Sequence, residues 1–137
     1  MKHLLFLAIL SFSALNINAQ VYEITEKEYV YEVFPNMNKP IVIDFYATWC
    51  RPCHQYSAIF NSVADEFNGK ADFYRVNIDE NNTWAQQWEI EYIPTTVVIY
   101  TKGEKMYKES GVMSKDKLIS LVKKAISKYK SDKQDYF

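Results

Sequence analysis

The stretch from Ile41 to His54 reads IVIDFYATWCRPCH. Its first part, Ile41 to Ala47, is a near-continuous apolar run, which predicts a strand buried on both faces in the interior of a sheet. The two cysteines therefore fall where a central strand hands over to a helix, at the carboxyl edge of the sheet, where active sites are commonly found. That helix is predicted from apolar residues that recur at alternating spacings of three and four, namely Cys53, Tyr56, Phe60, Val63 and Phe67.

The five residues from Cys50 to His54, CRPCH, match two incompatible motifs. C-x-x-C-H attaches a c-type haem, whereas C-x-x-C near a strand–helix–strand pattern exchanges disulfides. A haem needs His54 as one axial ligand and usually a second ligand. The other histidine, His3, lies in a segment that we expect to be removed, so a methionine would have to serve. A haem c electron carrier is therefore the disfavoured alternative to a thiol enzyme.

The composition predicts one ordinary domain and argues against polyanion binding. The chain has 137 residues, of which 48% are hydrophobic, and this suffices for a packed core without stabilising disulfides or metals. Lys and Arg number 16 against 17 Asp and Glu, so no net field attracts nucleic acid or an anionic membrane. We therefore expect no nucleic-acid partner, and we expect the domain to be a monomer.

The N-terminal segment, residues 1–19, has the layout of a signal peptide. The basic residue Lys2 precedes a largely apolar run from Leu4 to Leu15. A membrane-spanning helix needs about 20 apolar residues, so this run is short for an anchor and has the length of a signal-peptide core. We expect cleavage after Ala19, which leaves residues 20–137 as an exported domain, periplasmic or secreted. An uncleaved anchor and a cytosolic chain with an apolar start are the alternatives.

Export makes the cysteine count informative. Exported proteins with a structural disulfide framework usually carry several widely spaced cysteines. This chain has only Cys50 and Cys53, and a bridge that closes so small a loop constrains the unfolded chain very little. The pair is therefore explained better by reactivity than by stability.

The remaining patterns predict an α/β layout in a single domain. Parallel strands joined by crossover helices, followed by a terminal hairpin, give a central mixed β-sheet flanked by helices. Beside the strand and helix around the cysteines, the expected elements are a short strand at 21–24, a helix from the capping box Thr25–Glu28 to about Phe34, a strand at 71–77, a short helix at 81–88, strands at 95–100 and 105–110, and a last helix that opens at Ser114.

The positions of the two cysteines assign them different roles. A thiol must become a thiolate to act as a nucleophile. At the start of a helix, unsatisfied N–H groups and the positive end of the dipole favour the thiolate of Cys50. Cys53 lies one turn further in and is expected to be more buried, so we expect Cys50 to attack and Cys53 to resolve. Pro52 suits the first helical turn and stiffens the spacing between the sulfurs.

Several motifs together resemble the thioredoxin family. The segment from Asp44 to Cys53, DFYATWCRPC, resembles the active-site signature of that family. The segments VNID (76–79) and IPT (93–95), and then two glycines, follow in the order and at about the spacing that the family shows. The resemblance covers roughly Tyr22 to Ile126, which is nearly the whole predicted mature chain.

The resemblance implies a thioredoxin fold for residues 20–137 and a thiol–disulfide oxidoreductase that acts on disulfides of protein substrates. Its redox group is the Cys50–Cys53 disulfide, with no cofactor and no metal. In the family, the residue matching Pro94 has a cis peptide bond facing the cysteines, and the backbone matching Ile93 pairs with the substrate chain. The predicted substrate-binding residues are Trp49, Arg51, Pro52, Tyr92, Ile93, Pro94 and Gly111.

Asp44 is the third predicted catalytic residue, with Cys50 and Cys53. A charged carboxylate inside a buried strand is costly, so Asp44 must be paired or neutral. By similarity to the family it lies beneath Cys53 and acts as the base that deprotonates the resolving thiol. Arg75 stands where the family often has Lys, and it is expected to hold Asp44 ionised. An Asp without a role on a partly exposed strand face is the alternative.

Some positions depart from the common pattern of the family. Tyr46 replaces a frequent Trp, Arg51 replaces Gly, and Tyr92 replaces a small residue. Because Arg51 and Tyr92 border the predicted groove, they are expected to alter which substrates fit. His54 is expected to be a surface residue on the first turn of the helix, and Trp84 a packing residue.

The direction of exchange is the main open choice. In the family, Pro before the second cysteine is typical of reductants, and this chain has Pro52 there. A reductase is favoured, but because the periplasm is kept oxidising, it would need electrons from a membrane thiol donor. A disulfide oxidase or isomerase on the same fold is one alternative. Another is a redox-silent adaptor that uses the groove to bind peptides.

Overall fold

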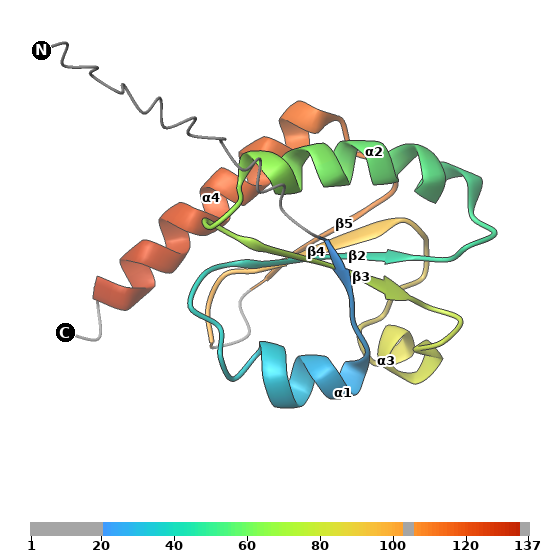
Figure 1. The fold of residues 1–137 in the computed structure, drawn as a ribbon, viewed down its shortest axis with the longest axis horizontal. Coiled ribbons are helices and arrows are strands. Elements are labelled where there is room, and N and C mark those ends of the chain that lie inside the picture. The colour runs from blue at the N-terminus through green and yellow to red at the C-terminus, as the bar shows by residue number, and fades with distance from the viewer. Residues whose placement is uncertain (1–20, 103–105, 135–137) are drawn as a thin grey trace, which may run out of the picture.

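The computed structural model describes residues 21–102 and 106–134 of the chain. The predicted signal peptide, residues 1–19, lies outside the described residues. The elements follow the order that the sequence predicts, as Figure 1 shows: β1 (Tyr22–Glu23), α1 (Glu26–Glu28), the π-helix η1 (Tyr29–Val33), β2 (Ile41–Tyr46), α2 (Arg51–Glu66), β3 (Asp72–Asn77), α3 (Asn82–Gln87), β4 (Thr95–Ile99), β5 (Met106–Ser110) and α4 (Lys115–Gln134).

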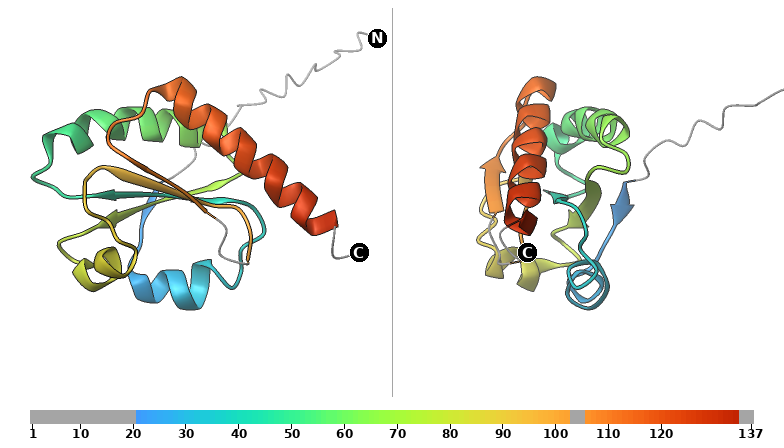
Figure 2. Two further views of the ribbon diagram at one scale, coloured as in Figure 1. Left: turned by 180° about the vertical axis from the view of Figure 1, so that it is seen from behind. Right: turned by 90° about the vertical axis from the view of Figure 1, so that its left-hand side faces the viewer.

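The strands form one mixed five-stranded sheet in the order β1-β3-β2-β4-β5. Strands β1, β3 and β2 are parallel, and β4 runs antiparallel to its neighbours β2 and β5. Helices α2 and α4 cover one face of the sheet, and α1 and α3 cover the other (Figures 1 and 2). The predicted α/β class, with a central mixed sheet flanked by helices, is confirmed.

Strand β2 lies at the centre of the sheet and is buried on both faces, as its apolar run predicts. Side chains alternate between the faces of a strand. Val42 accordingly packs in one core cluster with Phe60 of α2, while Ile43 and Phe45 pack in the other with Trp84 of α3. Full burial of each such side chain stabilises the fold by about 1.5–3 kcal/mol relative to exposure. The central strand is thereby fixed in place, and with it the start of α2.

Thr25 caps the first helix as the capping box predicts. Its hydroxyl accepts from the backbone N–H of Glu28 at 3.3 Å, and the Glu28 carboxylate accepts from the backbone N–H of Thr25 at 2.7 Å. The helix continues to Val33 with π-helical turns, in which the N–H of Phe34 donates to the carbonyl of Tyr29 at 2.8 Å. The wider turn places these two rings 5.5 Å apart, centroid to centroid. The helix expected up to Phe34 is thus present, but its second part is π-helical rather than α-helical.

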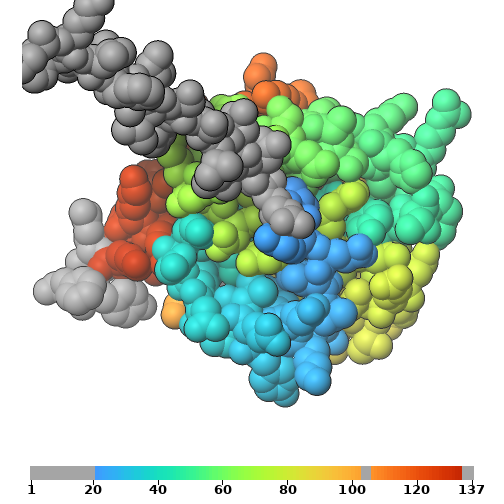
Figure 3. Space-filling model, viewed as in Figure 1, coloured from blue at the N-terminus to red at the C-terminus, as the bar shows by residue number. Residues whose placement is uncertain are grey.

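The edge strand β1 lies on the surface, and both of its residues are exposed. In the space-filling view of Figure 3, β1, α1 and η1 (blue to cyan) form much of the near face. In the turn that follows α2, Gly69 has a φ of +76°, which glycine adopts without strain. Within the described residues, no helix combines the length and the apolar character needed to cross a membrane.

Candidate active site

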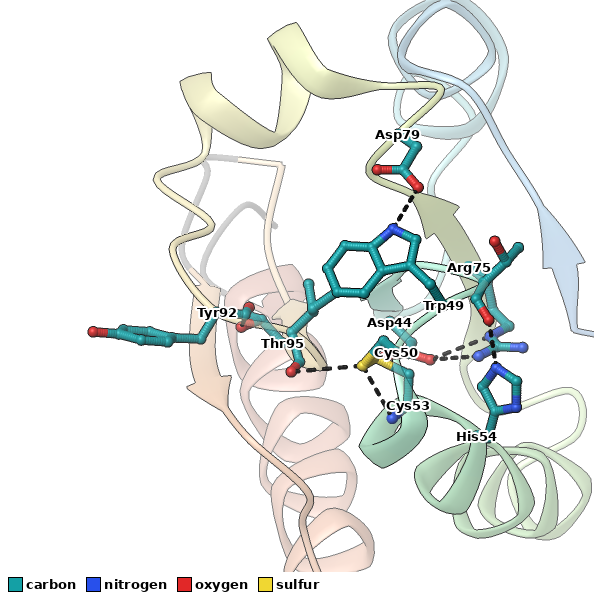
Figure 4. Close-up of a disulfide and its surroundings, with 11 residues drawn as sticks. Asp44, Trp49, Cys50, Cys53, His54, Arg75, Asp79, Tyr92 and Thr95 are labelled. Atoms are coloured by element: carbon teal, nitrogen blue, oxygen red, sulfur yellow. Dashed lines mark hydrogen bonds and ion pairs between the residues drawn. A yellow bond between two sulfur atoms is a disulfide. The ribbon is translucent and has the colours of Figure 1, made fainter.

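The cysteine pair stands at the start of α2. Cys50 is the N-cap residue, with an extended backbone, and Pro52 lies in the first turn as predicted. The backbone N–H of Cys53 donates to Cys50 Sγ at 3.2 Å, so a donor from the first helical turn is aimed at this sulfur. The two Cα atoms are 5.3 Å apart and the sulfurs are bonded to each other, as Figure 4 shows. The structure therefore holds the oxidised form of the pair.

The two cysteines differ in access to solvent. Cys50 retains 4% of its surface, whereas Cys53 retains none. Partly buried side chains, among them Tyr46, Ile78 and Ile93, pack around the pair. A disulfide that approaches from solvent therefore meets Cys50 first. This asymmetry agrees with the roles expected from the sequence, in which Cys50 attacks and Cys53 resolves.

The loop before β4 lies against the cysteine pair. The Ile93–Pro94 peptide bond is cis, as the resemblance implies. The carbonyl oxygen of Ile93 lies 3.9 Å from Cys50 Sγ. The carbonyl of Pro94 accepts from the backbone N–H of Gly111 at 2.7 Å, and Gly111 has a φ of +91°, which favours glycine. Two segments thus meet here: Ile93 and Pro94 lie in the loop beside Cys50, and Gly111, which follows β5, is hydrogen-bonded to that loop.

The other predicted substrate-binding side chains form an exposed rim. Trp49 is 69% exposed and Tyr92 is 68% exposed, and Arg51 is also exposed. In Figure 4 the ring of Tyr92 points away from the cysteines, and its backbone carbonyl accepts from the Thr95 hydroxyl at 2.6 Å. Tyr92 therefore borders the cysteine pair through its backbone, and its ring is presented to solvent.

Trp49 is held by Asp79, the last residue of the VNID segment, to which the sequence assigned no role of its own. The indole N–H of Trp49 donates to Asp79 Oδ2 at 2.8 Å (Figure 4). Asp79 follows β3 at the same carboxyl edge of the sheet at which β2 leads into the cysteines. A carboxylate at this edge is the sequence signal that points to Asp79, because parallel neighbouring strands end side by side.

His54 is a surface residue, as expected. Its Nε2 lies 2.7 Å from the backbone carbonyl oxygen of Thr48, within hydrogen-bond distance. This contact ties the first turn of α2 to the loop that precedes the cysteines. His54, the last residue of the CRPCH segment, therefore contacts the backbone just before the cysteines.

Asp44 is completely buried in the middle of β2. Its Oδ2 accepts from Arg75, whose Nε and Nη2 are each 3.2 Å away. No described residue contacts its other oxygen, Oδ1, through a hydrogen bond. Burial raises the pKa of Asp44 to about 6, because the cost of desolvating the charge exceeds the stabilisation from Arg75. Arg75 thus acts in the expected direction but does not outweigh burial, and Asp44 exchanges its proton near neutral pH.

The buried side of α2 lies over Asp44. Thr96 of β4 pairs with Asp44 in the sheet register, and the hydroxyl of Tyr56 lies 2.8 Å from Thr96 Oγ1. Tyr56 follows Cys53 by three residues, so both occupy the same face of the helix. In the view of Figure 4, Asp44 lies behind the cysteine pair. Asp44 is thus a buried carboxyl on the sheet face that α2 covers.

The described residues include no cluster of three His, Cys, Asp or Glu side chains that could hold a metal ion. A hollow of about 540 Å³ lies on the opposite sheet face, lined by residues such as Glu26, Trp84 and Met106. None of its lining residues belongs to the site around the cysteines.

Comparison with known proteins identifies the family. A family model described as Thioredoxin matches residues 20–124. Thioredoxin of Pyropia yezoensis is 34% identical over 107 residues, which are 78% of this chain and 98% of that protein. The crystal structure of Malassezia sympodialis thioredoxin superposes with a TM-score of 0.68 at 29% identity, over 79% of this chain and 92% of that one. The crystal structure of chloroplastic thioredoxin z shares the fold, with a TM-score of 0.72 at 23% identity over 79% of this chain and 96% of that one.

Thioredoxins act on protein disulfides, and they need no cofactor because the redox-active disulfide is part of the chain. The sheet topology and the WCRPC segment agree with this chemistry. The chain belongs to the thioredoxin family and is a thiol–disulfide oxidoreductase with the thioredoxin fold, in which Cys50 and Cys53 are the redox-active pair.

Proposed function

We propose that this protein reduces disulfides of exported proteins. The observation that carries the direction of exchange is Pro52, which lies between the two cysteines in the first turn of α2. In the family, Pro before the second cysteine is typical of reductants, so Pro52 supports a reductant. A strong oxidant would need a highly stabilised Cys50 thiolate, which makes its reduced form the favoured one.

The reaction proceeds in two steps that pass two electrons to the substrate. The Cys50 thiolate attacks one sulfur of a substrate disulfide, forms a mixed disulfide and releases the other substrate sulfur as a thiolate. Cys53 then loses its proton and attacks Cys50 Sγ. The Cys50–Cys53 bond forms, the mixed disulfide breaks, and the second substrate thiolate leaves.

Asp44 takes the proton of Cys53 in the second step. Its pKa, raised to about 6 by burial, leaves the carboxylate available at neutral pH while keeping it a stronger base than an exposed Asp. Its Oδ1 has no hydrogen-bond partner among the described residues and is the atom suited to accept the proton. The substrate lies against the exposed rim, with its backbone at Ile93 and its side chains near Trp49 and Arg51.

Export supplies the setting of this activity. The segment 1–19 has the pattern of a signal peptide, and reduction in an oxidising compartment requires electrons from a membrane thiol donor. N-terminal sequencing of the protein recovered from a cell envelope fraction tests this directly. A mature chain that begins at Gln20 supports the proposal, whereas recovery of the intact chain from the cytoplasm contradicts it.

The equilibrium reduction potential of the Cys50–Cys53 pair tests the direction of exchange. The protein is equilibrated in thiol–disulfide buffers, and its oxidised fraction is followed by trapping free thiols. We expect a value near that of reducing thioredoxins, about −270 mV. A value near that of strong oxidants, about −120 mV, would overturn the reductase in favour of an oxidase.

Trapping identifies the substrates. Cys53→Ser stops the reaction at the mixed disulfide, so substrate proteins stay attached to Cys50, and Cys50→Ser serves as the matched control that traps none. Absence of both a reversible couple and trapped proteins would favour the peptide-binding adaptor. A haem absorption spectrum from the exported protein would contradict every thiol mechanism at once.

A further inference from the structure

A row of aligned residues crosses the sheet at the level of Asp44. Glu23 of β1 pairs with Arg75 of β3 in the sheet register, and Arg75 pairs with Asp44 of β2. Tyr46 follows Asp44 by two residues, so both side chains point to the same face of the sheet. This face is the one that α2 covers. The register thus places four side chains close to one another. They are the carboxylates of Glu23 and Asp44, the guanidinium of Arg75 and the ring of Tyr46.

Contacts join these four side chains into a chain. The Arg75 guanidinium carbon lies 4.0 Å from the centroid of the Tyr46 ring, in a cation–π contact. The same guanidinium donates to Asp44 Oδ2 at 3.2 Å. The Tyr46 hydroxyl donates to Glu23 Oε1 at 2.7 Å. Burial raises the pKa of Tyr46 to about 12, so the hydroxyl keeps the proton that it donates. We call the Glu23–Tyr46–Arg75 chain the arginine clamp.

The arginine clamp stands between Asp44 and solvent. The Arg75 side chain is 21% exposed, whereas Asp44 is not exposed at all. A hollow of about 330 Å³ opens beside the clamp, and its lining includes Arg75 but not Asp44: Tyr46, Thr48, His54, Ser57 and Arg75. An arginine at such a wall can turn its guanidinium to water, and the ring and the anchored hydroxyl of Tyr46 oppose that movement.

We propose that Tyr46 is a positioning residue of the second reaction step, which holds Arg75 on Asp44 Oδ2 and so leaves Oδ1 to take the proton from Cys53. The proposal rests on the role proposed above for Asp44 as the base. It adds a residue that adjusts the proton affinity of this base through Arg75. Neither the WCRPC segment nor the cis-proline loop contains it.

The proton and electron balance of the step is complete within these groups. The Cys53 thiol gives its proton to Asp44 Oδ1, its sulfur bonds to Cys50 Sγ, and the substrate sulfur leaves with the electron pair of the broken bond. Asp44 later releases the proton to solvent, past Arg75.

Several groups face Asp44 from the elements around it. They are Arg75 from β3, Tyr56 from α2, and the uncharged Thr96 from β4. Burial raises the pKa of Tyr56 far above neutrality, so its hydroxyl does not ionise in the working range. Glu23 and Glu80 are the carboxylates that act on Tyr46. Arg75 is therefore the positive charge that the clamp can bring closer to Asp44 or release.

The direction in which the pKa of Asp44 shifts follows from the positive charge of Arg75. When the clamp is loosened, Arg75 spends less time at Asp44 and stabilises the carboxylate less. The pKa of Asp44 then rises further, and the second step needs a higher pH to reach half of its maximal rate. Complete removal of a neighbouring Arg raises an Asp pKa by about 1–3 units, so partial release by a Tyr46 substitution is expected to give a shift of about 0.5–1 unit.

Stopped-flow reaction with the aromatic disulfide dithiobis(nitrobenzoate) separates the two steps. The reduced protein releases one coloured thiolate when Cys50 attacks and a second when Cys53 resolves. Tyr46→Leu removes the ring and the hydroxyl, Tyr46→Phe removes only the anchor to Glu23, and Tyr22→Leu changes an exposed tyrosine of β1 outside the clamp. Both phases are measured from pH 4.5 to pH 9.

We expect Tyr46→Leu to move the midpoint of the second phase upward by about 0.5–1 pH unit, with the first phase changed less than twofold. Tyr46→Phe is expected to give a smaller shift in the same direction, and Tyr22→Leu none. A carbon-13 NMR titration of the Asp44 carboxyl in the oxidised protein must show the same shifts without any turnover. If Tyr46→Leu does not fold, Tyr46→Phe and Glu23→Gln carry the test.

The outcomes separate this proposal from the one on which it rests. If Asp44→Asn abolishes the pH dependence of the second phase but Tyr46→Leu leaves the midpoint and the Asp44 titration unchanged, the clamp is refuted and Asp44 remains the base. If Asp44→Asn leaves the second phase unchanged, the role of Asp44 is refuted, whatever Tyr46 does to the titration. Equal slowing of both phases in Tyr46→Leu, without a shift, would reduce Tyr46 to a packing residue and overturn the proposal.

Discussion

Replacement of Asp44 by Asn should stabilise the folded protein at neutral pH. Asp44 is completely buried, and burial raises the pKa of its carboxyl from 3.8 to about 6 despite the ion pair with Arg75. A carboxyl whose pKa is raised on folding binds its proton more tightly in the folded than in the unfolded state. Its ionisation therefore destabilises the fold, and the stability of the wild-type protein falls as the pH rises from about 4 to about 6.

The magnitude follows from the size of this shift. At about 1.4 kcal/mol per pKa unit, the rise to about 6 corresponds to about 3 kcal/mol at pH 7. Asn has nearly the same shape but cannot ionise, so Asp44→Asn escapes this destabilisation. The attraction between Arg75 and the carboxylate is already included in the net rise of the pKa, so its loss is not subtracted a second time. We therefore expect a net gain of about 2–3 kcal/mol at pH 7 and almost none at pH 4.

Urea unfolding of the oxidised protein at several pH values between 4 and 8, followed by tryptophan fluorescence, measures this gain by linear extrapolation. Asp65→Asn is the matched control, because it makes the same replacement at an exposed carboxylate of α2. A gain below about 1 kcal/mol at pH 7, or a gain of equal size at pH 4, would refute the reasoning that burial governs the ionisation of Asp44.

Three further substitutions probe the surroundings of the site. Trp49→Phe removes the 2.8 Å hydrogen bond to Asp79 from a side chain that is 69% exposed. We expect kcat/KM for disulfide reduction to fall about 3–10-fold, and the free energy of unfolding to change by less than about 1 kcal/mol. Tyr56→Phe removes the hydroxyl that bonds Thr96 in the core, and urea unfolding should show a loss of about 1–2 kcal/mol, against which an unchanged midpoint would count. Trp84→Ala should cost about 3–5 kcal/mol by the same measurement, because Trp84 is 2% exposed and packs against several rings; a cost near zero would contradict its place in the core.

The local features of the site could be predicted from the sequence because their causes lie within a few residues. The apolar run of β2 and the periodicity of α2 fix where the strand ends and the helix begins, and hence that Cys50 caps the helix and Cys53 lies one turn inside it. The capping box at Thr25 is equally local. The cis bond before Pro94 was expected only through the family resemblance, since composition and spacing do not distinguish cis from trans.

Other features depend on segments far apart in the chain, and the sequence did not reveal them. In the π-helix from Tyr29 to Val33, the ring of Tyr29 packs against Phe34 and Trp84, and no periodicity encodes these contacts. Asp79 reaches Trp49 because β3 and β2 end at the same edge of the sheet. The pKa of Asp44 also depends on tertiary structure. The degree of burial decides whether desolvation, which raises this pKa, or Arg75, which lowers it, dominates.

The sequence by itself determined the chemistry of this protein: two thiols at a helix start, a carboxylate in the strand before them, and the order of the elements that carry them. Only the tertiary structure decided how the carboxylate is tuned, because the arginine clamp joins β1, β2 and β3 through their register. Periodicity within one strand fixes which face a side chain occupies. The side chains that stand beside it come from the neighbouring strands, and their alignment is set by the packing of the whole sheet.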